Sequence, residues 1–247
     1  MLDNQDMSLI KRAVAYVVTR AYLRPIGLPV LHAVQYALSI HAREVVSFDQ
    51  TAERITLIRF IRDVFTRFGG QTMGVDEGYM IAMAVRKTSH LAGDIAEVGV
   101  FRGQSARVIC EMKETKQLHL FDTFHGLPEP GAIDSQFKEG EYASSIASVQ
   151  RFLASQANVY YYPGLFPATA APVADKQFSF VHLDVDLYES TRSCLEFFYP
   201  RLVQNGILIS HDYANAEGVR RAFDEFFSNR PELVLELTGT QCLVIKH

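Results

Sequence analysis

Residues 94–105, DIAEVGVFRGQS, contain the pattern that decides the fold. Residues 94–100 form a short apolar run, which is typical of a buried β-strand. Gly99 and Gly103 allow the backbone behind this strand to turn sharply. Residues 105–113, SARVICEMK, carry an apolar stripe at helical spacing, so we expect a helix that begins near Gln104. A strand, a glycine turn and a helix in this order indicate an α/β sheet.

The same alternation continues toward the carboxyl terminus. Further strands are expected at residues 117–123, 157–163, 178–186 and 206–213, and helices at 148–154, 188–199 and 217–227. The last two apolar runs, LVLEL and QCLVIKH, are separated by Thr238-Gly239-Thr240, which predicts an antiparallel hairpin. We therefore predict an α/β fold: a Rossmann-like, seven-stranded, mostly parallel sheet with a C-terminal antiparallel hairpin. The long polar stretch 124–143 is a candidate lid or binding loop.

The sequence predicts that residues 1–90 form a helical extension and lid that precedes the domain of residues 91–247. Helices are expected at about 10–22, 29–46, 52–68 and 77–90. Between residues 7 and 43 the sequence contains five Lys or Arg residues and no Asp or Glu. This bias could mean an acidic partner. The length and apolar stripe of residues 7–46 favour a dimer or domain interface, most simply between the subunits of a homo-oligomer, with the basic groups in water. Contact with an anionic membrane surface remains the alternative.

Composition narrows the class of protein. The net charge of −4 gives no indication of nucleic-acid binding. The N-terminus lacks the pattern of a signal peptide, and no apolar run is long enough to cross a membrane. The three cysteines are widely spaced, which argues against a zinc site and suits buried thiols in a reducing compartment. We expect a cytoplasmic protein.

Acidic residues and a histidine follow the predicted strands. Asp122 ends the second strand, where an acid can bind ribose hydroxyls; a turn cap is the alternative. Asp184 and Asp186 end the strand of residues 178–186, and His211-Asp212 end the next, which together could hold a divalent cation. Asp186 with Glu189 also matches a capping box, and a lone histidine is often a core residue, so both alternatives stay open.

Five segments together resemble the macrocin-type O-methyltransferase family of antibiotic biosynthesis, a group of class I S-adenosylmethionine-dependent methyltransferases. They are GDIAEVGVFRGQSA, LFDTFHGLP, YYPGLFPAT, HLDVDLYESTRSCLEFFYPRL and GILISHDY. The similarity covers roughly residues 71–227. It implies a magnesium-dependent enzyme that methylates a hydroxyl group on a small, sugar-bearing acceptor.

The resemblance implies specific roles. Asp184 would be a metal ligand, Asp186 the general base, and His211 and Asp212 the remaining ligands. The family commonly has two aspartates at the last pair, so His211 is a departure that could move the preference from Mg toward Mn, Fe, Co or Zn. The ammonium group of S-adenosylmethionine could be bound by Glu97. The expected cofactor-binding residues are Glu97, Gly99, Phe101, Arg102, Gly103, Ser105, Asp122 and Asp184.

Two other functions fit parts of the sequence. A catalytically impaired protein on the same fold could bind cofactor and metal as an interaction module, with His211 as the cause of the lost activity. A nicotinamide-dependent oxidoreductase is disfavoured because the G-x-G-x-x-G fingerprint is absent after the first strand and because the chain ends in a hairpin.

Overall fold

The computed structural model describes residues 52–67 and 73–247. Residues 55–247 form one compact unit, and residues 1–54, the other unit, lie almost entirely outside the described residues. The helices predicted at 10–22 and 29–46, the basic bias and the proposed oligomer contact therefore lie outside the described part of the chain. None of the described helices combines the length and hydropathy that a membrane span needs.

Seven strands form one sheet in the order β3-β2-β1-β4-β5-β7-β6. The first five pair in parallel, whereas β7 pairs antiparallel with both β5 and β6. This arrangement confirms the predicted fold class, including the terminal hairpin. The strands are β1 (Asp94–Val98), β2 (Leu118–Asp122), β3 (Val159–Pro163), β4 (Phe178–Leu183), β5 (Leu202–Ser210), β6 (Leu235–Glu236) and β7 (Cys242–Ile245).

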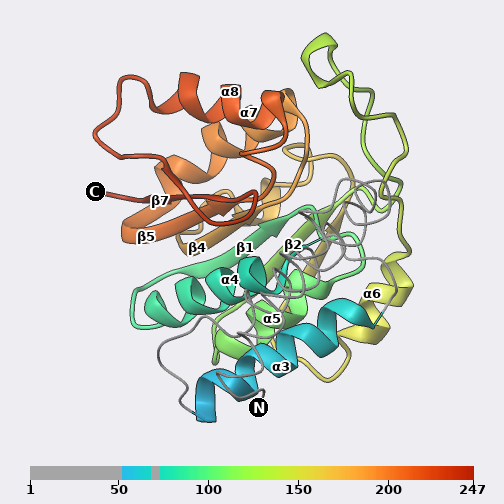
Figure 1. The fold of residues 1–247 in the computed structure, drawn as a ribbon, viewed down its shortest axis with the longest axis vertical. Helices are drawn as coiled ribbons and strands as arrows, with labels where there is room; N and C mark the ends of the chain where they lie inside the picture. The colour runs from blue at the N-terminus through green and yellow to red at the C-terminus, as the bar shows by residue number, and fades with distance from the viewer. Residues whose placement is uncertain (1–51, 68–72) are drawn as a thin grey trace, which may run out of the picture. The chain divides into compact units, whose positions relative to one another are not determined.

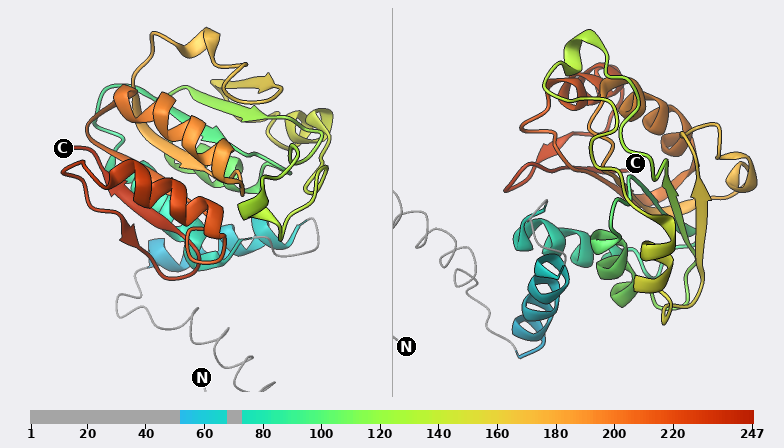
Figure 2. Two further views of the ribbon diagram at one scale, coloured as in Figure 1. Left: turned by 90° about the horizontal axis from the view of Figure 1, so that it is seen from above. Right: turned by 90° about the vertical axis from the view of Figure 1, so that its right-hand side faces the viewer.

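Helices cover both faces of the sheet (Figures 1 and 2). One face packs against α4 and α5, with α3 lying against these two helices, and the other face packs against α7 and α8. The α-helices of the described residues are α3 (Ala52–Thr66), α4 (Val75–Lys87), α5 (Gln104–Met112), α6 (Ile146–Phe152), α7 (Tyr188–Phe198) and α8 (Glu217–Phe227). The described part of the chain also contains the short 3-10 helices η2 (Ala132–Asp134), η3 (Ala171–Val173) and η4 (Tyr199–Arg201).

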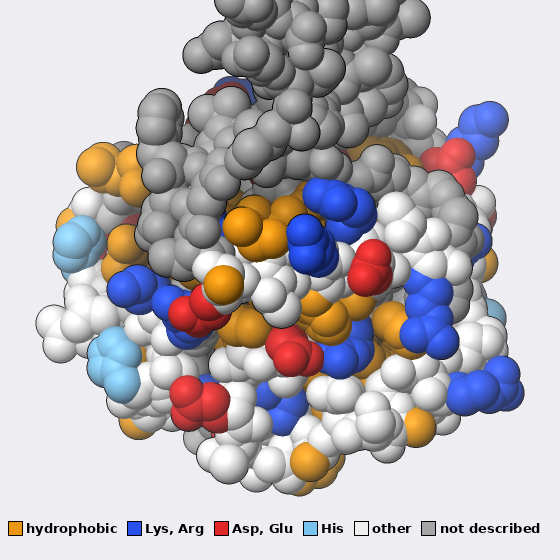
Figure 3. Space-filling view, turned by 60° about the horizontal axis from the view of Figure 1, so that its bottom comes forward, with side chains coloured by type: hydrophobic (Ala, Val, Ile, Leu, Met, Phe, Trp, Pro, Cys, Tyr) orange, Lys and Arg blue, Asp and Glu red, His pale blue; other side chains and the backbone are white. Residues whose placement is uncertain are grey.

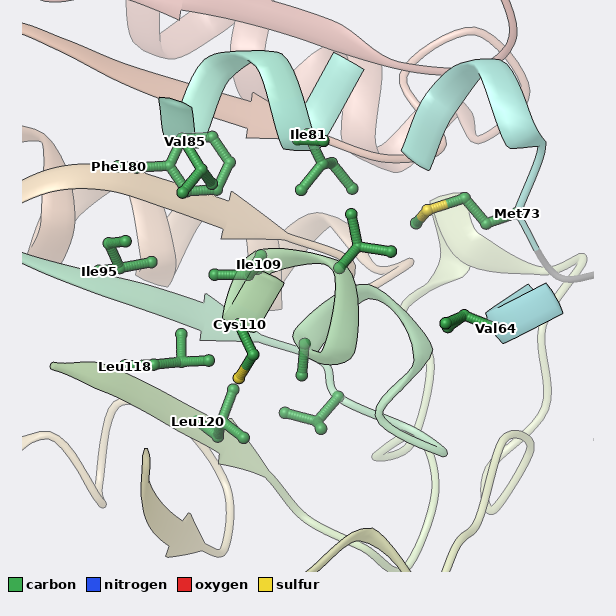
Figure 4. Close-up of a cluster of buried hydrophobic side chains, with 14 of the residues drawn as sticks. Val64, Met73, Ile81, Val85, Ile95, Ile109, Cys110, Leu118, Leu120 and Phe180 are labelled. Atoms are coloured by element: carbon green, nitrogen blue, oxygen red, sulfur yellow. The ribbon is translucent and has the colours of Figure 1, made fainter. Parts of the chain in front are cut away.

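Because helices cover both faces of the sheet, its central strands are buried on both sides. Every residue of β4 is buried, because a central parallel strand is covered on both sides. Its sequence is therefore mostly apolar, with Ser179 and His182 as buried polar exceptions. Phe180 of β4 packs with Ile81 and Val85 of α4 on one face (Figure 4). Its neighbour Val181 belongs to the cluster on the opposite face, with Leu195 of α7.

Some boundaries differ from the sequence prediction. The expected strand of residues 233–237 is reduced to Leu235–Glu236, and Leu233 is 73% exposed. Strand β5 begins at Leu202, earlier than expected, with an irregular register against β4 between Phe178 and Phe180.

On the face drawn in Figure 3, acidic and basic side chains are interspersed, with hydrophobic side chains between them.

Candidate active site

A pocket of about 370 Å³ opens beyond the carboxyl ends of the parallel strands. In the sheet, β1 lies between β2 and β4, so the strand order reverses there. Open α/β sheets bind their ligands at such a reversal. The described residues that line the pocket include Gly99, Phe101, Ser105, Asp122, Leu127, Tyr142, Leu165, Asp184, Asp186, His211 and Asp212.

The turn after β1 needs glycine at two positions. Gly99 has φ +86°, and a Cβ atom there would collide with the backbone oxygen of Asp184. Gly103 has φ +81° and directly precedes α5, which begins at Gln104 as predicted. Because a side chain at Gly99 would push the β1 turn away from the end of β4, this glycine brings the two strand ends together at the pocket.

Asp122 fixes the loops around the pocket. Its Oδ2 accepts hydrogen bonds from the amides of Val100 and Phe101 at 2.7 and 2.8 Å, and its Oδ1 accepts one from the amide of Phe124 at 2.6 Å. Asp122 therefore caps the turns after β1 and β2, which is the alternative that the sequence left open for this residue. A carboxylate has about four acceptor positions, so a ribose hydroxyl can still bind. Ribose binding by Asp122 stays a prediction.

The other expected cofactor residues divide into two groups. Gly99, Phe101 and Ser105 line the pocket, whereas Arg102 and Gly103 are absent from the described lining residues. The Arg102 guanidinium stacks 4.8 Å from the centroid of the Phe101 ring.

Glu97 is fully buried and does not line the pocket either. Its Oε1 lies 2.8 Å from Nδ1 of His182, which is equally buried on β4. Burial raises the pKa of Glu97, and the hydrogen bond with His182 opposes this shift. Binding of an ammonium group by Glu97 stays a prediction, and no sequence pattern indicates His182 as its partner.

Asp184, His211 and Asp212 converge at the ends of β4 and β5. One potential ligand atom from each residue lies within 4.8 Å of the others. Nδ1 of His211 is 3.2 Å from Oδ1 of Asp184 and 3.0 Å from Oδ2 of Asp212. The sequence prediction thus named three side chains that do meet in space.

The donor set suits a divalent cation. Carboxylate oxygens and a neutral imidazole nitrogen are both ligands of such ions. His211 is only 7% exposed, and neither ring nitrogen makes a hydrogen bond of good geometry with the described residues. Burial alone would lower the pKa of His211, but the carboxylates of Asp184, Asp212 and Glu77 outweigh burial and raise it. The same carboxylates would attract a metal cation, which would compete with the proton on His211, so with His211 neutral the residues present fit a cation at this position.

Asp186 stands beside this cluster and does not cap α7. The helix begins at Tyr188 with Leu187 as the preceding residue, and Asp186 has φ +60°. The capping-box interpretation is therefore wrong for Asp186. Burial, with added repulsion from Asp184 and Asp212, raises the pKa of Asp186. A cation among these carboxylates would oppose that shift and favour the ionised form.

The cap on α7 comes from Asp134, which the sequence did not indicate. Its carboxylate oxygens accept the Tyr188 amide hydrogen at 3.1 and 3.2 Å. Asp134 is buried and also lies against Gly218 at the start of α8, where a Cβ atom would collide with its carboxylate. No local pattern could reveal this contact, because 54 positions separate Asp134 from Tyr188.

Glu77 is a second residue that sequence reasoning missed. It is buried at the start of α4, and its Oε2 lies 3.4 Å from Nε2 of His211. Its carboxylate also accepts hydrogen bonds from the amides of Gly74 and Thr240 and from the Thr240 hydroxyl. Burial would raise the pKa of Glu77, but its contacts with His211, Gly74 and Thr240 lower it to about 2.

The loop of residues 124–143 forms one wall of the pocket. Its base is closed by hydrogen bonds between Leu127 and the Gly140-Glu141 segment. Tyr142 lines the pocket, is 46% exposed and packs edge-on against Phe101 with ring centroids 5.8 Å apart. Together with the Asp134 cap, these contacts hold the wall in place, and Tyr142 offers an aromatic surface beside the acidic cluster.

Solved O-methyltransferases have the same fold. The O-methyltransferase NovP superposes with a TM-score of 0.63 at 24% identity, covering 70% of this chain and 80% of that one. An O-methyltransferase from Bacillus cereus, solved in complex with SAH, gives a TM-score of 0.57 at 13% identity and covers 85% and 97% of the two chains. The sheet and helices are therefore those of a Rossmann-like methyltransferase.

The sequence identifies the family within that class. Residues 77–237 match the model of the macrocin-O-methyltransferase (TylF) family, and the chain belongs to this family. A curated relative from Streptomyces olivaceus, 8-demethyl-8-(2,3-dimethoxy-alpha-L-rhamnosyl)-tetracenomycin-C 4'-O-methyltransferase, is 32% identical over 139 residues. That match covers 49% of this chain and 53% of the relative, so the chain spans about half the length of the curated relative.

Proposed function

We propose that this chain is an S-adenosylmethionine-dependent O-methyltransferase acting on a hydroxyl group of a small, sugar-bearing natural product. Family membership supports the reaction type. The relative from Streptomyces olivaceus is named for an acceptor that carries a rhamnosyl group, which supports a sugar-bearing acceptor here. We further propose that Asp184, His211 and Asp212 hold a divalent cation.

One observation carries the proposal. Asp186 and the three candidate ligands share a single pocket with the glycine turn after β1. In this arrangement a cofactor at Gly99 and an acceptor hydroxyl at Asp186 would meet in one pocket. Holding two reactants in such proximity is a large part of catalysis for a methyl group that is already activated.

The reaction needs a methyl donor, an activated hydroxyl and a base. When bound, S-adenosylmethionine would supply the methyl group, and the cation would lower the pKa of the acceptor hydroxyl. Asp186 would accept the hydroxyl proton as the new carbon–oxygen bond forms and the carbon–sulfur bond breaks. Tyr142 and Leu165 would line the acceptor side, where apolar and aromatic surfaces orient a ligand.

A transfer assay tests this function. The protein would be incubated with radiolabelled S-adenosylmethionine and a panel of rhamnosylated polyketides and nucleotide-linked deoxysugars. We expect label on an acceptor hydroxyl, loss of transfer with a chelator, and recovery with added Mg²⁺ or Mn²⁺. Transfer that continues in the presence of chelator would contradict the metal role alone. Failure to bind S-adenosylmethionine would contradict the whole proposal.

A further inference from the structure

We infer that Glu77 is a positioning residue for the cation site, holding the Nε2 edge of His211 so that Nδ1 faces Asp184 and Asp212. The inference rests on the proposed cation site and deepens it. Glu77 lies on α4, outside the strand ends that carry the three candidate ligands. It would therefore add a fourth residue to the site, acting through the histidine.

The contacts of His211 define an orientation. Its Nδ1 lies 3.2 and 3.0 Å from carboxylate oxygens of Asp184 and Asp212. Its Nε2, on the other side of the imidazole ring, lies 3.4 Å from Oε2 of Glu77. The ring is thus enclosed between the candidate ligands and Glu77, with one nitrogen toward each.

Glu77 is itself held firmly. Its Oε2 accepts the amide hydrogen of Gly74 at 2.6 Å, and its Oε1 accepts from the amide and hydroxyl of Thr240 at 2.7 and 2.9 Å. The residue is 5% exposed. A Cβ atom at Gly239 would contact its Oε1 at 2.5 Å, so the hairpin turn between β6 and β7 closes tightly over the carboxylate.

The orientation of the His211 ring determines which of its nitrogens can bind a metal ion. A neutral histidine binds a metal through one nitrogen and carries its hydrogen on the other. A carboxylate that accepts that hydrogen fixes the tautomer and increases the basicity of the ligand nitrogen. With a cation bound among the three candidate ligands and Glu77 on the Nε2 side, the hydrogen would lie on Nε2 and the lone pair of Nδ1 would be directed at the cation between Asp184 and Asp212.

The tautomer can be observed in the wild-type protein. Long-range proton–nitrogen NMR spectra of the Mg²⁺-loaded full chain, with isotope-labelled histidine, show which ring nitrogen carries hydrogen. The His211 signals are assigned by their loss in His211→Asp. We expect hydrogen on Nε2 and none on Nδ1. Hydrogen on Nδ1 in the loaded protein would overturn the inference.

Mn²⁺ binding tests the role of Glu77 in affinity. Electron paramagnetic resonance measures free Mn²⁺ during titration, and pulsed spectra of the bound ion detect a coordinated imidazole nitrogen. We expect that coupling in the wild type, and affinity about 10- to 100-fold weaker in Glu77→Gln, the usual effect of losing such a partner. Glu111→Gln, which removes one exposed charge from α5, is the matched control and should bind as the wild type does.

Repeating the Glu77→Gln substitution in the His211→Asp variant distinguishes positioning of His211 from a general structural role of Glu77. In the His211→Asp background no imidazole N–H faces Glu77, so adding Glu77→Gln should change Mn²⁺ affinity by less than about twofold. Equal weakening in both backgrounds would overturn the inference, as would wild-type affinity in Glu77→Gln. Binding without nitrogen coupling in the wild type would overturn it and would remove His211 from the proposed ligands, leaving a cation held by carboxylates. No Mn²⁺ binding by the wild type would overturn both.

Discussion

The carboxylate of Asp134 accepts the backbone amide hydrogen of Tyr188 at 3.1 Å, so a residue from the loop after β2 caps helix α7. Asp186, two positions before the helix, does not cap it and stands next to Asp184 and Asp212. The cap also ties the pocket wall of residues 124–143 to the helix that follows Asp186.

Replacing Asp134 with alanine should lower the free energy of unfolding by about 1–3 kcal/mol, because a buried amide loses its charged acceptor. Chemical denaturation of Asp134→Ala and of the exposed control Asp175→Ala measures the difference. Equal stability of the two variants would show that the cap contributes nothing measurable.

Much of the fold could be predicted because it depends on local patterns. The fully buried run of β4 and the apolar stripe of α8 follow directly from burial on a two-sided sheet. The candidate ligands Asp184 and Asp212 could be predicted for a related reason. The carboxyl ends of neighbouring parallel strands meet at one edge of the sheet, so residues that follow such strands lie close together.

The parts that were missed depend on contacts between distant segments. Glu77 meets Thr240 across 163 positions, and no periodicity encodes such a pair. Asp186 and Glu189 matched a capping box by spacing alone, but the left-handed backbone at Asp186 moves the start of the helix to Tyr188. The pattern therefore identified a helix start and assigned the wrong residue to it.

Asp122 should contribute to cofactor binding. Asp122→Ala removes a carboxylate at the end of β2 and should weaken S-adenosylhomocysteine binding by about 1.5–3 kcal/mol, the range for a hydrogen bond to a charged group. Calorimetric titration measures this loss, and a thermal melt checks that the loops held by Asp122 remain folded. Unchanged affinity in a folded variant would remove the ribose role.

Stability should depend on pH through Glu77. Its pKa is lowered from 4.5 to about 2, so its contribution is complete above pH 4.5 and is lost as the pH falls toward 2. The stability difference between wild type and Glu77→Gln should therefore be larger at about pH 6 than at about pH 3, by about 2 kcal/mol. Denaturant unfolding at both pH values measures it, and a difference independent of pH would refute the assignment.

Tyr142 should bind the acceptor and leave the cofactor unaffected. Tyr142→Ala removes an exposed ring from the pocket wall and should raise the acceptor KM by about tenfold, which corresponds to roughly 1.4 kcal/mol. Tyr142→Phe keeps the ring and its edge contact with Phe101, so its KM should stay close to that of the wild type. If Tyr142→Ala instead weakened S-adenosylhomocysteine binding, the residue would belong to the cofactor side.

Asp186 should be required for turnover and dispensable for the cation. Asp186→Asn retains the shape of the side chain, but its amide cannot take the hydroxyl proton. We expect Mn²⁺ affinity close to that of the wild type together with loss of methyl transfer, whereas Asp184→Ala should lose both. Retained turnover in Asp186→Asn would show that another group is the base.

The most direct test of the proposed site is anomalous diffraction from a crystal grown with Mn²⁺ and S-adenosylhomocysteine. We predict one Mn²⁺ peak bound by Asp184, Asp212 and Nδ1 of His211, with Asp186 beside it and uncoordinated. A crystal in which S-adenosylhomocysteine is bound but no Mn²⁺ lies among these residues would contradict the central claim.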